Sequence, residues 1–192
     1  MIDIDPSALK NAQDMLKGIP GAAQKAAKTA IRKTMRGAKQ DAVRKVKERY
    51  TIQPGAISRT MDIGLSGGGL SGELRSKGRV NSLADFRHNP RSVPKNRWPT
   101  GKYLYAQVIK GEGGTIAHAF LARMASGHVG IFQRGDHGET NTSTPISKLN
   151  APSVPQMLES ETICGFLQKR MEERLQSNMD HEVNAFLMGY RK

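Results

Sequence analysis

The sequence has one cysteine in 192 residues, Cys164, and this scarcity excludes an intramolecular disulfide and a cysteine metal cluster. The cysteine lies in a strongly helical pattern, where we expect it to be a small buried hydrophobe. The sequence also lacks any run of eighteen apolar residues, and residues 1–10 lack a basic segment followed by an apolar one. Without these features, the sequence predicts a soluble protein made in the cytoplasm, with no membrane contact.

Acidic residues are scarce as well: 17 Asp and Glu oppose 30 Lys and Arg, which gives a net charge of +13. The excess is uneven, since residues 1–60 carry +8, residues 61–110 carry +6 and residues 155–192 carry −1. A basic first half indicates a polyanion or an acidic protein surface as the partner of that half. Charge alone does not distinguish these partners.

Two helices are predicted near the N-terminus, over residues 6–17, after a capping Asp5, and over residues 20–50, after a break at Gly18. In the second helix, mostly small apolar residues recur at three- and four-residue steps and form one stripe. The members of this stripe are Ala23, Ala27, Ala30, Ile31, Thr34, Met35, Ala38, Ala42, Val43 and Val46. Basic residues occupy the remaining surface, so the helix is predicted to be amphipathic and strongly basic. A turn and a short helical piece follow over residues 51–61.

The middle of the chain has the alternating pattern of strands. Strands are predicted over residues 70–78, 103–110, 116–124 and 128–134. A turn at Ser126 and Gly127 joins the last two, which indicates an antiparallel sheet. Gly67–Gly69 is interpreted as a hinge before the first strand. Residues 81–101 contain prolines and basic residues without a sustained period, so we interpret them as a long basic loop and a candidate contact surface.

The C-terminal part is predicted as one long amphipathic helix that starts at a capping box of Ser153 and Gln156. Its apolar residues, at helical spacing, are Ile163, Phe166, Leu167, Met171, Leu175, Met179, Val183, Phe186, Leu187 and Tyr190. N-terminal basic helices, a central antiparallel sheet with long loops and this helix make an α+β fold. The expected single domain, residues 1–192, has a basic helical part (1–60), a part of sheet and loops (61–150) and the C-terminal helix (151–192).

Three constellations resemble sites of chemistry without matching their patterns. The spacing of His118, His128 and His137 fits no compact metal-ligand motif. Ser126 and His128 lack a nucleophile elbow, an oriented base and a marked oxyanion hole. The glycines within residues 64–72 are followed by a strand, and not by the lysine of a Walker loop or the helix of a dinucleotide-binding fold. We therefore predict no catalytic, metal or cofactor site, and we expect that the protein is not an enzyme.

The basic residues are the strongest physical signal. A solvated helix face is the alternative interpretation, since charged residues commonly cover the outside of a helix. Residues 25–50 nevertheless hold ten basic residues and two acidic ones, a density that water, phosphate or an acidic surface must compensate. The chain has no motif that recognises a nucleic-acid sequence, so any contact with nucleic acid is expected at its phosphate backbone and independent of base sequence. The candidate DNA-facing or partner-facing residues are Lys25, Lys28, Arg32, Lys33, Arg36, Lys39, Arg87, Arg91, Lys95 and Arg97.

Several stretches resemble one known family. Residues 119–134, AFLARMASGHVGIFQR, closely resemble the minor tail protein Z family of tailed phages. Residues 145–149, PISKL, and 152–157, PSVPQM, resemble the stretch that leads into the final helix of that family. A looser likeness includes RYTI at residues 49–52 and FRHNP at residues 86–90, so the resemblance covers most of the chain.

The resemblance implies a tail-completion protein of the virion, assembled in the host cytoplasm and located at the head-tail junction. The implied partners are copies of the chain in a ring, the tail terminator and head connector proteins, and genomic DNA through nonspecific contact. The implied role is tail-to-head joining and positioning of DNA in the channel, while Phe120 and Phe132 are assigned to core or sheet packing. Two alternatives stay open: another head-tail connector or tail-terminator component, and a non-virion protein that binds nucleic acid independently of sequence.

Overall fold

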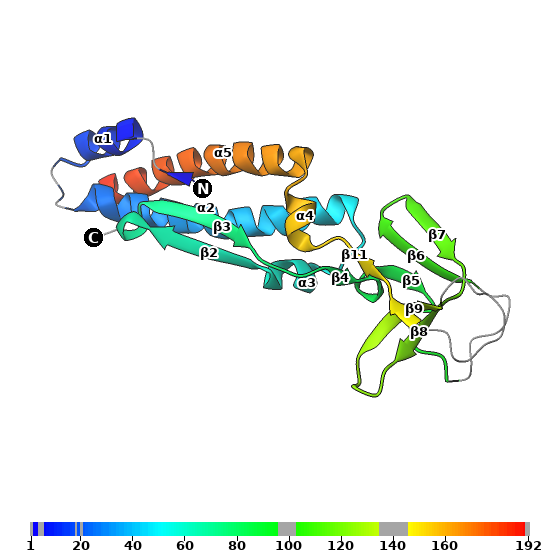
Figure 1. Ribbon diagram of the computed structural model, residues 1–192. Helices are drawn as coiled ribbons and strands as arrows, with labels where there is room; N and C mark the ends of the chain where they lie inside the picture. Colours follow the sequence, from blue (N-terminus) through cyan, green and yellow to red (C-terminus); the bar gives the residue numbers. More distant parts are fainter. Residues whose placement is uncertain are drawn as a thin grey trace. The chain divides into compact units, whose positions relative to one another are not determined.

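The computed structural model describes residues 2–3, 6–17, 19, 21–95, 103–134 and 146–190. The chain divides into two compact units. Unit 1 contains residues 1–44, 58–77 and 158–192, and unit 2 contains residues 45–57 and 78–157. Helices and several small antiparallel sheets make the protein α+β, which confirms the predicted fold class (Figure 1).

Unit 1 combines long helices with a small antiparallel sheet of strand order β1-β3-β2. Its elements are β1 (Ile2–Asp3), α1 (Pro6–Met15), α2 (Ala22–Arg49, of which the last five residues belong to unit 2), β2 (Met61–Ser66), the 3-10 turn η1 (Gly67–Gly69), β3 (Ser71–Ser76) and α5 (Glu161–Leu187). The two predicted N-terminal helices are confirmed as α1 and α2. Helix α5 and the β2–β3 hairpin both lie along α2 (Figure 1).

The core of unit 1 is the contact between α2 and α5. The apolar stripe predicted on α2 is largely buried, and its members Ala27 and Ala30 have no exposed surface. They share one core cluster with Met179 and Phe186 of α5. Alanine lets the helices approach closely, and the larger side chains of α5 fill the remaining space. Burial of each such Met or Phe side chain contributes about 1.5–3 kcal/mol.

Gly67–Gly69 forms the turn of the β2–β3 hairpin, so its interpretation as a hinge is wrong. The backbone φ angles of Gly67, Gly68 and Gly69 are +57°, +65° and +95°, a region that glycine adopts without steric cost. The hairpin register is continuous from Met61 opposite Ser76 to the turn. The predicted strand over residues 70–78 is confirmed as β3, whereas its partner β2 was not predicted.

Unit 2 contains antiparallel strands with short helical pieces. They are α3 (Pro54–Arg59), β4 (Asn81–Ser82), the 3-10 turn η2 (Leu83–Asp85), β5 (Arg87–Asn89), β6 (Leu104–Ile109), β7 (Glu112–Ile116), β8 (Ala119–Arg123), β9 (Val129–Arg134), β10 (Ile146–Lys148), β11 (Asn150–Ala151) and α4 (Val154–Leu158). The ends of α3 and α4 extend into unit 1. Within the described residues, the strand orders are β5-β6-β7, β10-β9-β8 and β11-β4. The antiparallel arrangement is confirmed, but the sheet is divided instead of being one central sheet.

The strand predicted over residues 116–124 is in fact parts of two strands. Ile116 ends β7, and β8 begins at Ala119 after a turn in which His118 has a φ of +58°. The hairpin from β8 to β9 is confirmed, and the rings of Phe120 and Phe132 lie 6.2 Å apart across it. That distance is typical of a packed aromatic pair, as the assignment of both residues to sheet packing predicts.

The prediction of a long loop over residues 81–101 is wrong for the first part of this segment. Residues 81–89 form β4, η2 and β5. The Ser82 hydroxyl accepts a hydrogen bond from the Ala84 backbone, while the Asp85 carboxylate accepts one from the Ser82 backbone, so a capping box fixes the turn. Residues 96–101 of the predicted loop lie outside the described residues.

The single C-terminal helix predicted from the sequence is interrupted. The capping box of Ser153 and Gln156 is confirmed, but it begins the short helix α4. Helix α5 starts separately after Ser160, whose extended backbone places its carbonyl to accept from the amides of Ile163 and Cys164. Cys164 is exposed, so its predicted burial is wrong: it lies one residue, or about 100° of helical rotation, from the buried Ile163.

Candidate functional site

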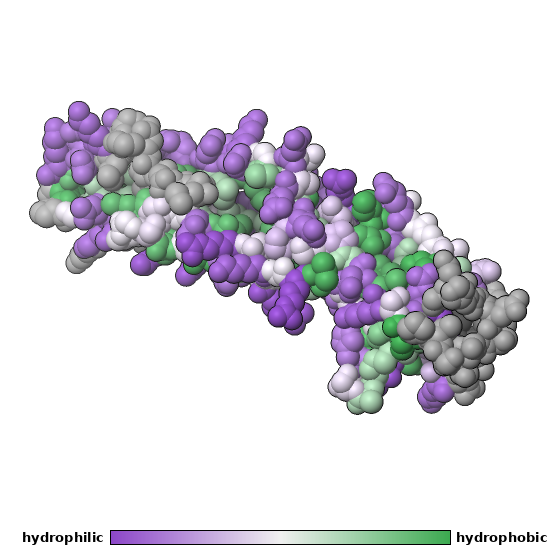
Figure 2. Space-filling view, in the orientation of Figure 1, coloured by the Kyte–Doolittle hydropathy of each residue, from purple (hydrophilic) through white to green (hydrophobic). Residues whose placement is uncertain are grey.

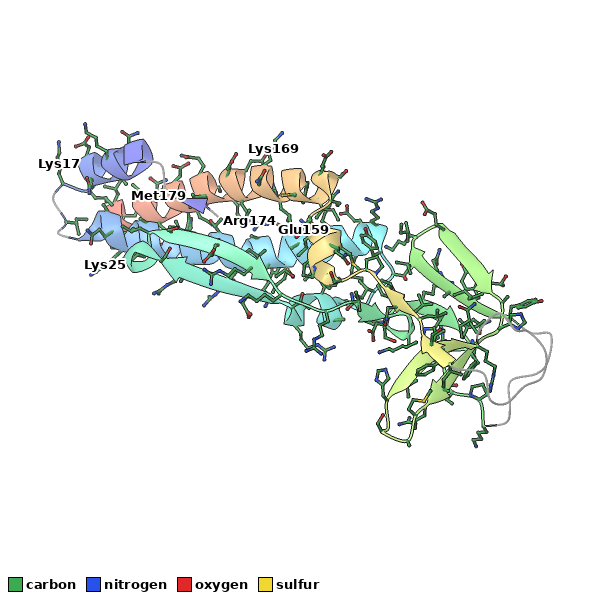
Figure 3. All side chains as sticks on the ribbon, in the orientation of Figure 1. Lys17, Lys25, Glu159, Lys169, Arg174 and Met179 are labelled. Carbon is green, nitrogen blue, oxygen red and sulfur yellow. The ribbon has the colours of Figure 1, made fainter. Side chains whose placement is uncertain are left out.

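Three of the six candidate basic residues on α2 form one exposed stripe: Lys25, Arg32 and Arg36. They are spaced seven and four residues apart, which is close to whole helical turns, so they share one face. None of the three forms an ion pair or a side-chain hydrogen bond with another residue that the structure describes. Lys25 projects from α2 on the side away from α5 (Figure 3). We call these three residues the exposed stripe.

The other three basic residues on α2 contact neighbouring elements of unit 1. The Lys33 ammonium lies 2.6 Å from Oε1 of Glu182 on α5. The Lys39 ammonium donates a hydrogen bond of 2.6 Å to the carbonyl of Met61 at the start of β2. The side-chain carbons of Lys28 lie against the η1 turn. These residues therefore help to hold α5 and the hairpin on α2, while the exposed stripe lies between those two contacts.

Further polar pairs cross the contact between α2 and α5. Asp41, only 3% exposed, accepts hydrogen bonds from Arg174 on α5 at 2.7 Å and from Arg44 at 2.6 Å. Asn178 donates to the Thr34 hydroxyl at 2.9 Å. Figure 3 shows Arg174 on the side of α5 that faces α2. These polar contacts fix the antiparallel register of the two helices, and no local pattern in the sequence reveals them.

Hydrophilic residues are prominent on the visible surface of unit 1 (Figure 2). Purple residues extend along the edges of the part built from α1, α2 and α5, with green apolar residues between them. The view agrees with the burial pattern of α2, in which apolar residues turn inward and basic residues outward.

The remaining candidates belong to unit 2. Arg87 on β5 is exposed, as are Arg91 and Lys95 in the segment that follows, and Arg97 lies outside the described residues. Of these, Arg87 takes part in a surface pocket of about 440 Å³. The pocket is lined by Lys47, Tyr50, Thr51, Arg87, Gln107, Lys110 and Gly111, and we call it the unit 2 pocket.

The unit 2 pocket brings together basic residues from three distant parts of the chain. Lys47 comes from the last turn of α2, Arg87 comes from β5, and Lys110 directly follows β6. Lys47 and Lys110 were not among the candidate residues. Their only sequence signal is that each lies near the end of a predicted element, and this signal does not show that the two ends meet.

The histidine group and the Ser126–His128 pair, which the sequence did not support as sites, also have no supporting geometry in the described part of the chain. No group of three or more His, Cys, Asp or Glu side chains there could hold a metal ion. Ser126 and His128 are exposed beside the β8–β9 turn, and His137 lies outside the described residues. Within the same residues, no helix is both long enough and apolar enough to span a membrane.

The fold and these surfaces define a basic α+β protein with exposed cationic side chains on both units. No family model, curated protein or solved structure matches the chain significantly. The resemblance to the minor tail protein Z family therefore stays a prediction.

Proposed function

We propose that the protein is a non-catalytic structural component of a tailed-phage virion that completes the head-proximal end of the tail. In this proposal, copies of the chain form a ring at the head-tail junction, next to the tail terminator and head connector proteins. The ring assists tail-to-head joining and the positioning of DNA in the channel. The resemblance of residues 119–134, 145–149 and 152–157 supports the family, and the basic surface supports a polyanionic neighbour.

The exposed stripe is the observation that carries this proposal. Its residues lie on the part of α2 that neither α5 nor the hairpin occupies, and they have no acidic partner among the described residues. Positive charges without internal partners are available to phosphate or to an acidic protein surface. Contacts of this kind do not read bases, as is suitable for DNA of any sequence passing through a channel.

Electron microscopy of intact particles tests the location. Density for this chain in a ring at the head-tail junction is the expected result. Absence of the chain from the particle would refute the structural role and favour a non-virion nucleic-acid-binding protein. A ring elsewhere in the particle would refute tail completion and favour another connector or terminator component.

Charge neutralisation tests the role of the exposed stripe. The variant K25Q/R32Q/R36Q retains helix propensity, because glutamine, lysine and arginine are all good helix formers. We expect normal circular dichroism but impaired head-tail joining and reduced infectivity. The matched control K10Q/K77Q/K169Q removes three exposed charges elsewhere on unit 1 and is expected to join normally. Equal infectivity of the two variants would contradict the assignment of the stripe.

A further inference from the structure

We propose that the unit 2 pocket binds a phosphate group, held by Lys47, Arg87 and Lys110. This site is separate from the exposed stripe, because all of its lining residues belong to unit 2. It also does not depend on a virion location. The ligand class follows from the charge, the hydrogen bonding and the size of the pocket.

The walls of the pocket are fixed by internal hydrogen bonds. The Thr51 hydroxyl donates to the Gln107 carbonyl and accepts from the Arg87 backbone amide at 3.1 Å. The Thr51 amide donates to the Val108 carbonyl at 3.0 Å, and the Lys110 amide donates to the Arg49 carbonyl at 2.8 Å. The end of α2 is therefore tied to β6, and β5 is tied to both. Such a preformed wall lowers the entropic cost of ordering the site around a ligand.

The same bonds determine which groups are left for a ligand. The Thr51 hydroxyl is already both donor and acceptor within the wall. The side chains of Lys47, Arg87 and Lys110 form no ion pair with any residue that the structure describes, and the lining has no acidic residue. The charged groups of the lining are therefore all cationic donors, which favour an oxyanion, and the other polar side chains, Tyr50 and Gln107, are uncharged.

The negative C-terminus of α2 offsets only part of the positive charge at the pocket. A helix C-terminus carries about half a negative charge, which one nearby lysine already offsets. After this half charge is subtracted, the three cations at the pocket leave an excess of about 2.5 positive charges. A phosphate dianion neutralises most of that excess, and the arginine fork can bind two of its oxygens while each lysine acts as a point charge.

The size of the pocket agrees with a ligand larger than a simple ion. Its volume of about 440 Å³ lies within the range of about 300–1,000 Å³ that is usual for small-molecule sites. One phosphate can therefore enter with the sugar or chain to which it is attached. The shared chemistry is a phosphate group, whose source is either a free nucleotide or the backbone of a nucleic-acid strand.

The test is a titration of the full chain with inorganic phosphate at constant ionic strength, followed by two-dimensional NMR of the backbone amides. We expect saturable shifts of the amides of Thr51, Arg87 and Lys110. The variant K47Q/K110Q should bind phosphate at least about tenfold more weakly, because it loses two charged partners. The matched control R79Q/K148Q loses two exposed charges of unit 2 outside the pocket and should bind within about twofold of the unmodified chain.

The outcomes separate the proposal from general attraction between opposite charges. Shifts that do not saturate, or that weaken equally in the two variants, overturn the site. Absence of shifts in the pocket of a folded unmodified chain also overturns it, whereas selective loss in K47Q/K110Q supports it. If K47Q/K110Q loses the folded spectrum, R87K replaces it, and weaker binding by R87K supports the site through loss of the two-oxygen contact.

Competition identifies the source of the phosphate once saturable binding is established. Displacement by adenosine monophosphate but not by a short DNA duplex assigns the site to free nucleotides. Displacement by the duplex assigns it to a nucleic-acid backbone, with the steep salt dependence of such contacts. If the pocket binds phosphate but the chain is absent from virions, the proposed function alone is refuted. If the chain forms a ring in the virion but its pocket binds no phosphate, this inference alone is refuted.

Discussion

The Lys33 ammonium lies 2.6 Å from a carboxylate oxygen of Glu182, and the glutamate side chain has no exposed surface whereas the lysine side chain is 40% exposed. A cation at the surface thus neutralises an acid inside the contact between α2 and α5. Removal of a partner from a buried carboxylate costs much more than loss of an exposed ion pair, because the remaining charge stays away from water.

We expect K33M to lower the free energy of unfolding by about 2 kcal/mol, between the values for exposed and fully buried pairs. The double variant K33M/E182Q should recover part of this loss, since it also removes the buried charge of Glu182. Urea denaturation followed by circular dichroism measures both changes. K169M, on the outer side of α5, is the control (Figure 3). A loss no larger for K33M than for K169M would contradict the role of the pair.

Whether replacement of Gly37 by alanine stabilises or destabilises the protein depends on the neighbouring side chain of Arg174. A Cβ at this position would lie 2.7 Å from Cδ of Arg174, whose guanidinium is held by Asp41 at 2.7 Å. Replacement of glycine by alanine usually stabilises a helix by about 1 kcal/mol. In this protein G37A should destabilise by about 1 kcal/mol, because it displaces the arginine from its partner.

The background R174A removes the obstruction and should restore the usual gain from G37A. A double-mutant cycle over the four proteins, with stability measured in urea, isolates this coupling. Stabilisation by G37A in both backgrounds would show that Arg174 moves aside freely.

At Gly72 the hairpin packs closely against α2. A Cβ there would lie 2.8 Å from Cγ of Met35 and 3.0 Å from Cγ2 of Ile31, both in buried residues. We expect G72A to destabilise the protein by about 1–3 kcal/mol through overpacking. G64A is the matched control on the opposite strand, where the new methyl meets the side chain of Glu73. The prediction fails if thermal unfolding shows equal stability of the two variants.

Replacement of a basic residue of α2 should affect stability differently according to whether that residue contacts another element. Lys39 donates to the Met61 carbonyl, so K39M should cost about 1 kcal/mol through loss of that hydrogen bond. R36M, in the exposed stripe, should change stability by less than about 0.5 kcal/mol. Urea midpoints of the two variants measure the difference. A larger loss for R36M would indicate that the stripe serves folding and not an external partner.

The long helices were predictable because their signal is repeated over many turns. The alanine-rich stripe of α2 and the apolar spacing of α5 each fix a buried face without knowledge of the partner. Strand β7 had no such signal: its sequence Glu112–Ile116 contains two glycines and little alternation, and pairing with β6 determines its conformation. The break before α5 was missed because a capping box signals where a helix starts and not where it ends.

The sequence showed that basic residues are abundant on the candidate surfaces, but it did not show which of them lie together in the fold. Counting basic residues found the exposed stripe together with Lys33 and Lys39, and it could not separate them because their partners, Glu182 and Met61, are distant in sequence. The convergence of Lys47 with Lys110 depends on the tertiary pairing of the end of α2 with β6. Such pairings are long-range, and local periodicity contains no information about them.

The pairing of α2 with α5 also determines when unit 1 can form during translation. Asp41 is 133 residues from Arg174 in sequence, and Thr34 is 144 residues from Asn178. On the ribosome, the α5-facing side of α2 emerges long before α5 is synthesised, and contacts across such separations form slowly. The nascent chain thus exposes an apolar helix face until α5 is synthesised, and such a surface is prone to aggregation.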